Sequence, residues 1–267
     1  MISLFGSSLH PEKINNLINS INNDIEYELV LCGPRKEYVP IREINGIPFK
    51  YIYSDFKPVQ CAMIAATYAK GRYLLHIVDD IYFESKAGLS CLIDEFEQYS
   101  VDSLFPILMS TRLKRDDYSF INSDYYLYND VNYPVPISLF CSKELFFKLN
   151  GFSSLFITSM ADANLLWRAI DTFNAKFYIS TSVVIELKNI NELSLFNVYG
   201  KSDINTLLKF KNNSINLKFF QLNNIELTQI KPMGLWRFKG IKSKLFIKKI
   251  LLLNYKILSK IKKILNC

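Results

Sequence analysis

The sequence contains no pair of cysteines at the close spacing that a zinc site or a redox motif requires. Its cysteines are odd in number and are scattered singly along 267 residues, so they do not form a disulfide framework either: Cys32, Cys61, Cys91, Cys141 and Cys267. Isolated cysteines are typical of proteins in a reducing compartment. We therefore expect a cytoplasmic protein.

Long apolar runs are also missing. No uncharged apolar run approaches the roughly 18–20 residues that a transmembrane helix needs. The first residues, MISLFGSSLHPEK, lack a basic segment followed by a long apolar one, which argues against a signal peptide. Hydrophobic residues nevertheless make up 49% of the chain and charged residues 21%. These proportions are typical of a folded globular protein.

Acidic residues are scarce at the C-terminal end. Residues 201–267 contain 15 Lys or Arg and 2 Asp or Glu, a net charge of +13. Residues 1–200 contain 17 Lys or Arg and 23 Asp or Glu, a net charge of −6. A basic tail of this kind is typical of a segment that meets an anionic surface. Because the body is mildly acidic, we expect no nucleic-acid binding. We divide the chain into a body (1–200), a connecting segment (201–240) and a basic segment (241–267).

The basic segment is predicted to form an amphipathic helix. At about 100° per residue, its lysines and its apolar residues fall on opposite sides of the helix. A lysine-rich polar face fits a helix that lies in an anionic membrane surface, and we favour this over packing against the body or another subunit. The expected location is thus cytoplasmic and peripheral, at the inner face of the membrane.

Short apolar segments alternate with helical patterns in the first half of the chain. Strands are expected at 1–5, 27–32, 49–53 and 73–78, with helices at 11–21 and 59–69 between them. This alternation is the pattern of right-handed βαβ crossovers, and it predicts an α/β fold with a mainly parallel sheet flanked by helices. Ligands bind at the carboxyl ends of such strands. Four turns fall there: Phe5–Ser8, Gly33-Pro34, Ser54-Asp55 and Asp79-Asp80.

The second half continues the pattern with one long polar interruption. We expect a helix at 87–99, a strand at 103–109, a helix at 142–149 and a single strand at 177–187. Residues 110–133 are rich in Tyr, Asn and Asp, and we interpret them as a long functional loop or a hairpin.

Two motifs resemble a known family. From Phe49 to Phe83 the order is strand, helix, Ala69-Lys70-Gly71, apolar strand and acidic pair, which resembles the nucleotide-sugar-binding half of GT-A fold glycosyltransferases of the family 2 group. The second motif joins Gly151-Phe152 to a helix that starts at Asp162. It is similar to the acceptor-side signature of the same family, with Leu165 and Arg168 in matching places.

The resemblance implies a nucleotide-sugar donor, a surface-glycan or lipid-linked acceptor, and an inverting, metal-dependent transfer. Carboxylates suit Mn²⁺ or Mg²⁺, because these ions prefer hard oxygen ligands. A general base would take the proton of the attacking hydroxyl. The expected donor-site residues are Gly6, Ser7, Asp55 and Asp79; the expected metal ligands are Asp80, Asp79 and Glu186; the expected base is Asp162.

Several alternatives stay open. Val78 occupies the first acidic position of the usual motif, so the chain also fits a catalytically inactive binding or scaffold subunit at the membrane. Asp55 fits a turn equally well, and Glu186 fits a solvated strand end. His76 is expected to be a hydrogen-bonded core residue. A nucleotidyltransferase ranks last, because FGSSLHPEK is a poor phosphate-binding loop. Neither the oligomeric state, the nucleotide base nor the acceptor follows from the sequence.

Overall fold

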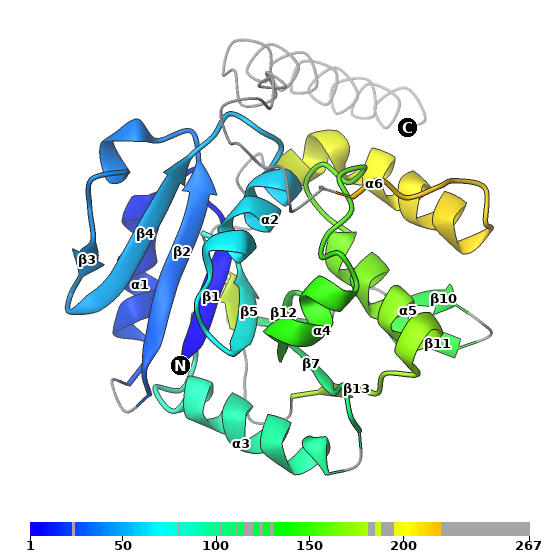
Figure 1. The fold of residues 1–267 in the computed structure, drawn as a ribbon, viewed down its shortest axis with the longest axis horizontal. Helices are drawn as coiled ribbons and strands as arrows, with labels where there is room; N and C mark the ends of the chain where they lie inside the picture. Colours follow the sequence, from blue (N-terminus) through cyan, green and yellow to red (C-terminus); the bar gives the residue numbers. More distant parts are fainter. Residues whose placement is uncertain are drawn as a thin grey trace, which may run out of the picture.

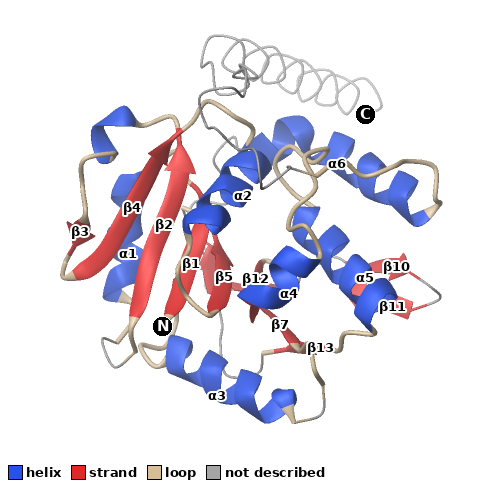
Figure 2. Ribbon diagram, viewed as in Figure 1, coloured by secondary structure: helices blue, strands red, loops and turns tan. Residues whose placement is uncertain are grey.

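The computed structural model describes residues 1–22, 25–79, 81–101, 103–110, 112–114, 120–122, 125–128, 131–180, 185–187 and 195–219. Within these ranges an eight-stranded sheet has the order β13-β7-β12-β5-β1-β2-β4-β3. Helices pack on both of its faces (Figures 1 and 2). The predicted α/β class is therefore confirmed.

The strands of the main sheet are β1 (Ile2–Ser7), β2 (Tyr27–Gly33), β3 (Glu43–Ile44), β4 (Ile47–Tyr53), β5 (Tyr73–Ile77), β7 (Ile107–Ser110), β12 (Ser138–Ser142) and β13 (Phe177–Ile179). A second sheet contains β6 (Ile81–Phe83), β8 (Arg112–Lys114), β9 (Phe120–Asn122) and β14 (Ile185–Leu187), and a hairpin contains β10 (Tyr125–Tyr128) and β11 (Val131–Pro134). The helices are α1 (Ile14–Asn19), α2 (Pro58–Tyr68), α3 (Gly88–Ser100), α4 (Lys143–Lys148), α5 (Ala161–Phe173) and α6 (Leu195–Lys211), with short 3-10 turns at Pro11–Lys13 and Lys36–Tyr38.

The centre of the main sheet is parallel. β4, β2, β1 and β5 run in the same direction, whereas β12 runs antiparallel to both β5 and β7. Every residue of β2 and all but the last residue of β1 are buried. This explains their almost unbroken apolar sequences, because helices cover both faces of a parallel sheet.

Two hydrophobic clusters fill the space between the sheet and its helices. On one face Phe5 and Leu74 pack with residues of α2, α4 and α5, including the fully buried Trp167. On the other face Leu4 and Leu75 pack with residues of α1 and α3. Adjacent residues of one strand thus enter different clusters, because successive side chains of a strand point to opposite faces.

The predicted single strand at 177–187 is wrong. Phe177–Ile179 pairs with β7 at the edge of the main sheet, and the N–H of Ser180 donates to the carbonyl of Met109 at 3.0 Å. Among the described residues β7 ends at Ser110, one residue beyond the partner of Ile179. Ile185–Leu187 pairs instead with β6 and β8 in the second sheet.

The polar stretch 110–133 contains hairpin strands. β8 pairs antiparallel with β9, and β10 pairs antiparallel with β11. Of the two interpretations of this stretch, the hairpin therefore holds where the structure describes it.

The expected boundary at residue 200 falls inside α6, which packs on the body through Asp203 and Leu207. The basic segment at 241–267 lies outside the described residues. Among the helices that are described, none combines the length and the hydrophobicity that crossing a membrane would require.

We expect Gly6→Ala to lower the free energy of unfolding by about 1–3 kcal/mol, the usual cost of forcing an extra group into a packed core. A Cβ atom at Gly6 would lie 2.1 Å from the carbonyl oxygen of Ile77 on β5. Urea unfolding of both proteins measures the difference. Ser7→Ala, one residue further along β1, serves as the control, and an unfolding energy equal to wild type for Gly6→Ala would contradict the close approach.

Candidate functional site

The carboxyl ends of β1, β2, β4 and β5 meet at one edge of the sheet, as the sequence predicted. Hydrogen bonds tie the turns that follow these strands to one another. The N–H of Ser8 donates to Cys32 at 2.9 Å, and the N–H of Ser54 donates to Gly33 at 2.8 Å. The turns after β1 and β4 are therefore both anchored to the end of β2.

Asp79 braces the loop that follows β1. Its Oδ2 accepts the backbone N–H groups of Leu9 and His10 at 2.8 and 2.9 Å. Burial raises the pKa of the Asp79 carboxyl above its ordinary value, and the two N–H donors oppose this effect. One oxygen of Asp79 thus holds the protein's own backbone.

Tyr51 joins the same loop to the turn after β2. Its hydroxyl donates to the carbonyl of Ser8 at 2.9 Å and accepts the N–H of Arg35 at 3.3 Å. The Arg35 guanidinium donates to the carbonyl of Leu9 at 3.4 Å and pairs with Glu37 at 2.5 Å. A cationic side chain therefore stands at the sheet edge beside the braced loop.

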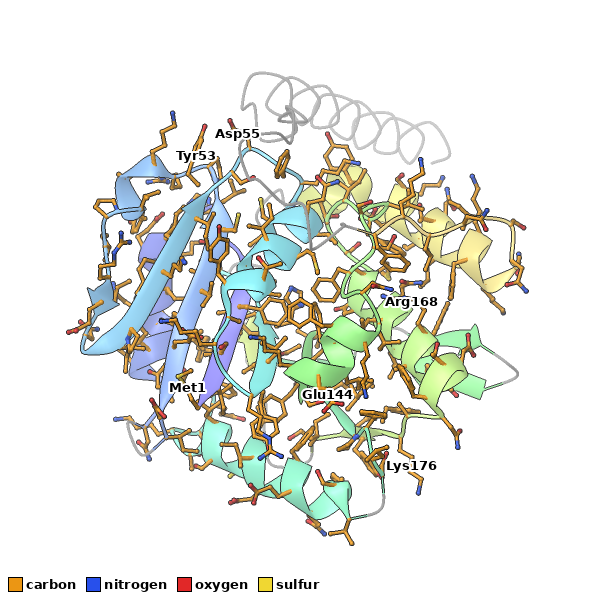
Figure 3. All side chains as sticks on the ribbon, in the orientation of Figure 1. Met1, Tyr53, Asp55, Glu144, Arg168 and Lys176 are labelled. Atoms are coloured by element: carbon orange, nitrogen blue, oxygen red, sulfur yellow. The ribbon has the colours of Figure 1, made fainter. Side chains whose placement is uncertain are left out.

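The other expected donor-site residues lie at this edge in different roles. Gly6 is inside β1, paired with Leu31 and Ile77, and is not part of a loop as expected. Ser7 is half-buried at the end of that strand. Asp55 follows β4, and its Oδ2 accepts the Tyr53 hydroxyl at 2.7 Å (Figure 3). The close packing of β1 against β5 explains the glycine at position 6, whereas Ser7 and Asp55 are half-buried at the ends of their strands.

The expected metal ligands come from three segments. Asp80 lies outside the described residues, and so does the side chain of Glu186. The antiparallel register of β6 and β14 places the backbone of Glu186 opposite Tyr82, two residues after Asp80. Among the described side chains no cluster of three or more His, Cys, Asp or Glu forms a metal site. The three carboxylates suit Mn²⁺ or Mg²⁺ chemically, but Oδ2 of Asp79 is already engaged.

Asp162 is the second residue of α5 and is buried, with 9% of its surface exposed. Its Oδ1 accepts the N–H of the next residue, Ala163, at 2.9 Å. Burial raises the pKa of Asp162 from 3.8 to about 6, although backbone N–H groups oppose the shift. A carboxyl with this pKa can accept a proton near neutral pH.

The loop before Asp162 belongs to the same edge of the sheet. The first turn of α2, which follows the Ser54–Asp55 turn, contacts it twice. The N–H of Val59 donates to the carbonyl of Ile157 at 3.1 Å, and the Gln60 side chain donates to the carbonyl of Ser154 at 3.3 Å. The structure therefore brings the acceptor-side motif beside the turn that contains Asp55.

Arg168 and Asn164 have structural roles in this motif. The buried guanidinium of Arg168 donates to the carbonyls of Leu149 and Gly151 and to Oδ1 of Asn164. These bonds join the end of α4 to α5, and burial lowers the pKa of Arg168 to about 9. The Nδ2 group of Asn164 has no partner among the described residues.

Sequence reasoning missed Asp203 of α6. This carboxylate is 1% exposed and accepts the N–H groups of Ile157, Thr158 and Ser159 at 2.8–3.0 Å. The hydroxyls of Thr158 and Ser159 lie 3.1 and 3.4 Å from its Oδ2. A signal was present in the sequence, because residues 201–267 contain just two acids, Asp203 and Glu226.

His76 is half-buried on β5 and packs against aromatic rings of the core. Its ring lies 5.4 Å from that of Phe5 and 5.0 Å from that of Phe152, and burial lowers its pKa to about 4. Its Nδ1 atom has no partner in the described part of the chain. The ring is therefore neutral at physiological pH.

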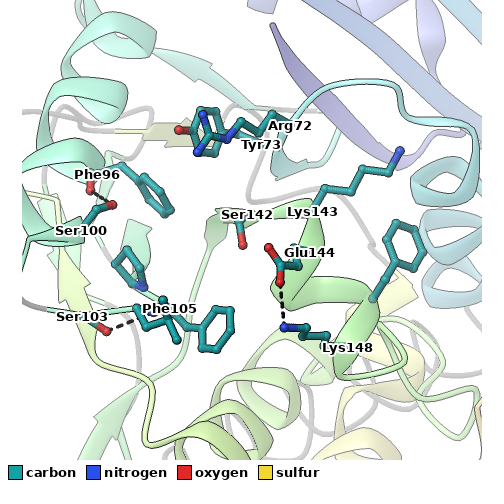
Figure 4. A pocket seen from close by; sticks show the side chains of 13 residues that line it. Arg72, Tyr73, Phe96, Ser100, Ser103, Phe105, Ser142, Lys143, Glu144 and Lys148 are labelled. Carbon is teal, nitrogen blue, oxygen red and sulfur yellow. Dashed lines mark hydrogen bonds and ion pairs between the residues drawn. The ribbon is translucent and has the colours of Figure 1, made fainter.

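A cavity of about 760 Å³ lies at the opposite edge of the sheet (Figure 4). Arg72 and Tyr73 line it at the start of β5, together with Lys143, Glu144 and Lys148. Its cations already have partners: Lys143 donates to the carbonyl of Ala69 at 2.6 Å, Lys148 pairs with Glu144 at 2.7 Å, and Arg72 lies over the Tyr73 ring. None of the residues predicted to be functional lines this cavity.

We expect Asp162→Asn to stabilise the protein near neutral pH. A folded-state pKa of about 6 against 3.8 means that ionised Asp162 costs about 3 kcal/mol of unfolding free energy at pH 7, and that the cost fades as the pH falls from 6 towards 3.8. The Asn variant avoids this cost and keeps an oxygen for the N–H of Ala163. Urea unfolding at pH 7 and pH 4.5 measures the difference, and an equal gain at both values would contradict the burial of an ionisable group.

Comparison with known proteins shows the fold. No family model matches the chain, and no curated protein matches it. Among solved structures, residues 1–349 of S. aureus TarS superpose with a TM-score of 0.57 at 11% identity, over 83% of this chain and 67% of that one. The same fragment in complex with UDP superposes with a TM-score of 0.55 at 12% identity, over 86% of this chain and 75% of that one. The chain thus has a GT-A-like fold, which it shares with TarS.

Proposed function

We propose that the protein is a glycosyltransferase of the family 2 type, which moves a sugar from a nucleotide-diphosphate donor to a glycan or lipid-linked acceptor. The observation that carries this proposal is the position of Asp162. A buried carboxyl with a pKa of about 6 opens a helix whose preceding loop contacts α2 beside the carboxyl edge of the parallel sheet. Ligands of α/β folds bind at that edge.

In the proposed reaction Asp162 takes the proton of the acceptor hydroxyl while the oxygen of that hydroxyl attacks the anomeric carbon of the donor sugar. The bond from that carbon to the diphosphate oxygen breaks on the opposite side, so the configuration inverts. A base whose pKa lies near the working pH is effective because it is ionised and still accepts a proton. The activity should therefore fall as the pH drops below about 6.

The donor diphosphate is proposed to lie over the turns after β1 and β5. Arg35 supplies positive charge there, and the loop from Ser8 to His10 is held in place by Asp79. A divalent cation held by Asp80 and Glu186, with the remaining oxygen of Asp79, would supply Lewis-acid stabilisation of the leaving diphosphate. Asp79 is thus proposed to act mainly by bracing the loop.

We expect one nucleotide sugar to bind and this binding to need Mn²⁺ or Mg²⁺. UDP-sugars are the first to test, because a TarS structure of the same fold contains UDP. Titration calorimetry with UDP-, GDP-, CDP- and dTDP-sugars, with metal and with EDTA, measures the affinity. Asp80→Ala should weaken metal-dependent binding at least about tenfold, whereas Asp94→Asn, an exposed acid of α3, should not.

The expected outcome distinguishes the enzyme from an inactive scaffold. Donor binding together with sugar transfer that is lost in Asp162→Asn supports the enzyme. Binding of no nucleotide, with or without metal, would mean that Asp79 only braces its loop and that Asp80 holds no metal for a donor, and the scaffold alternative would then hold.

We further propose that residues 241–267 attach the protein to an anionic membrane surface. Reversing Lys248, Lys256 and Lys260 to Glu should lower partitioning onto phosphatidylserine vesicles at least about 100-fold, since each lysine near such a surface contributes about 1 kcal/mol. The matched control reverses three exposed lysines outside the basic segment, Lys86, Lys176 and Lys201. Flotation assays measure the partitioning. Equal losses of vesicle binding in the two variants would mean that the net charge of the protein, and not the basic segment, determines membrane binding.

A further inference from the structure

Residues that follow position 200 hold the loop before Asp162 by hydrogen bonds. Asp203 accepts five donors from Ile157, Thr158 and Ser159, three from the backbone and two from hydroxyls. The carbonyl of Lys218 accepts the hydroxyl of Ser153 at 2.9 Å and the N–H of Ser154 at 2.8 Å. The stretch 153–159 is thus held at both of its ends.

The side of α6 that faces the body explains how Asp203 reaches the loop. Gly200, Asp203 and Leu207 are buried, whereas Lys201 and Ser202 are exposed. A spacing of three and four residues places these three positions on one side of a helix. The helix therefore presents a carboxylate where an amphipathic helix would normally place an apolar side chain.

The contacts with Asp203 end at the residue before a strained position. Met160 has a φ of 63°, in the left-handed region that non-glycine residues rarely adopt, and its carbonyl accepts the N–H of Asn164 as α5 begins. Such a conformation persists only where the surroundings enforce it. The carboxylate of Asp203 fixes the two residues before Met160, and Asp162 follows two residues after it.

We propose that Asp203 is a positioning residue for sugar transfer: by holding Ile157, Thr158 and Ser159, it sets the start of α5 and thereby the place of Asp162. This inference rests on the proposed function. Asp203 itself is buried behind the loop and does not contact the reacting atoms. Its contribution is to the geometry of the base, since misplacement by about 1 Å costs roughly 100-fold in rate.

Asp203→Asn tests the proposal by two independent measurements. The amide group puts N–H donors where the loop also presents donors, so the amides of Ile157, Thr158 and Ser159 should exchange hydrogen at least about tenfold faster. The kcat of transfer should fall roughly 10- to 100-fold, and the KM for the donor should change less than about twofold. Asp203→Glu, which keeps the carboxylate, should recover part of both losses. Asp94→Asn is the matched control.

The exchange measurement separates this proposal from the proposed function. If the wild type transfers no sugar from any donor, the proposed function fails, yet exchange of the three amides still shows whether Asp203 holds the loop. Unchanged exchange and unchanged kcat in Asp203→Asn would overturn the proposal. Faster exchange across the whole sheet would overturn it too, since that pattern marks general unfolding.

Thr158→Val provides a second variant that retains the buried carboxylate. It removes the hydroxyl 3.1 Å from Oδ2 and leaves three backbone donors and the Ser159 hydroxyl. A smaller loss of kcat in the same direction, with an unchanged KM, supports the proposal even if Asp203→Asn folds poorly. A loss confined to KM would overturn it.

Discussion

The backbones of β1 and β5 approach so closely at Gly6 and Ile77 that no side chain fits between them. Parallel pairing with β2 on one side and with β5 on the other places the end of β1 between theirs, so that Asp79, beyond β5, reaches the N–H groups of Leu9 and His10, beyond β1. The edge that binds ligands in α/β folds is therefore a connected network of turns.

Asp162 and Asp203 are both buried acids, but their carboxyl groups differ in the hydrogen-bond donors that surround them. Five donors surround Asp203, and charge-assisted hydrogen bonds of this kind offset the cost of taking a carboxylate out of water. Asp162 accepts local backbone N–H groups among the described residues, and burial raises its pKa to about 6. The surroundings of Asp203 suit a carboxylate that holds a loop in place, and those of Asp162 suit a carboxyl group that exchanges a proton.

The similarity to TarS extends over most of the chain at 11–12% identity. Sequences this different can adopt the same fold because the fold needs only apolar strands, helices that cover both faces of the sheet and short connections. Many sequences satisfy these requirements. Binding and catalytic groups sit in the loops, which vary most between proteins of one fold. The ligands of this chain therefore depend on its own loops.

The alternation of strands and helices in the first half of the chain was predictable from the sequence, and so was the meeting of the carboxyl ends of these strands at one edge of the sheet. The hairpin was one of two interpretations of 110–133, and the role of Asp162 as a base stays a prediction. Periodicity and turn residues are local properties, and parallel strands necessarily bring their carboxyl ends together. Tertiary structure alone decided that 177–187 divides between two sheets, that Asp79 braces a loop, and that Asp203 holds the segment before Asp162. These contacts join residues 44 to 106 positions apart, and no local pattern specifies which distant donor a carboxylate will meet.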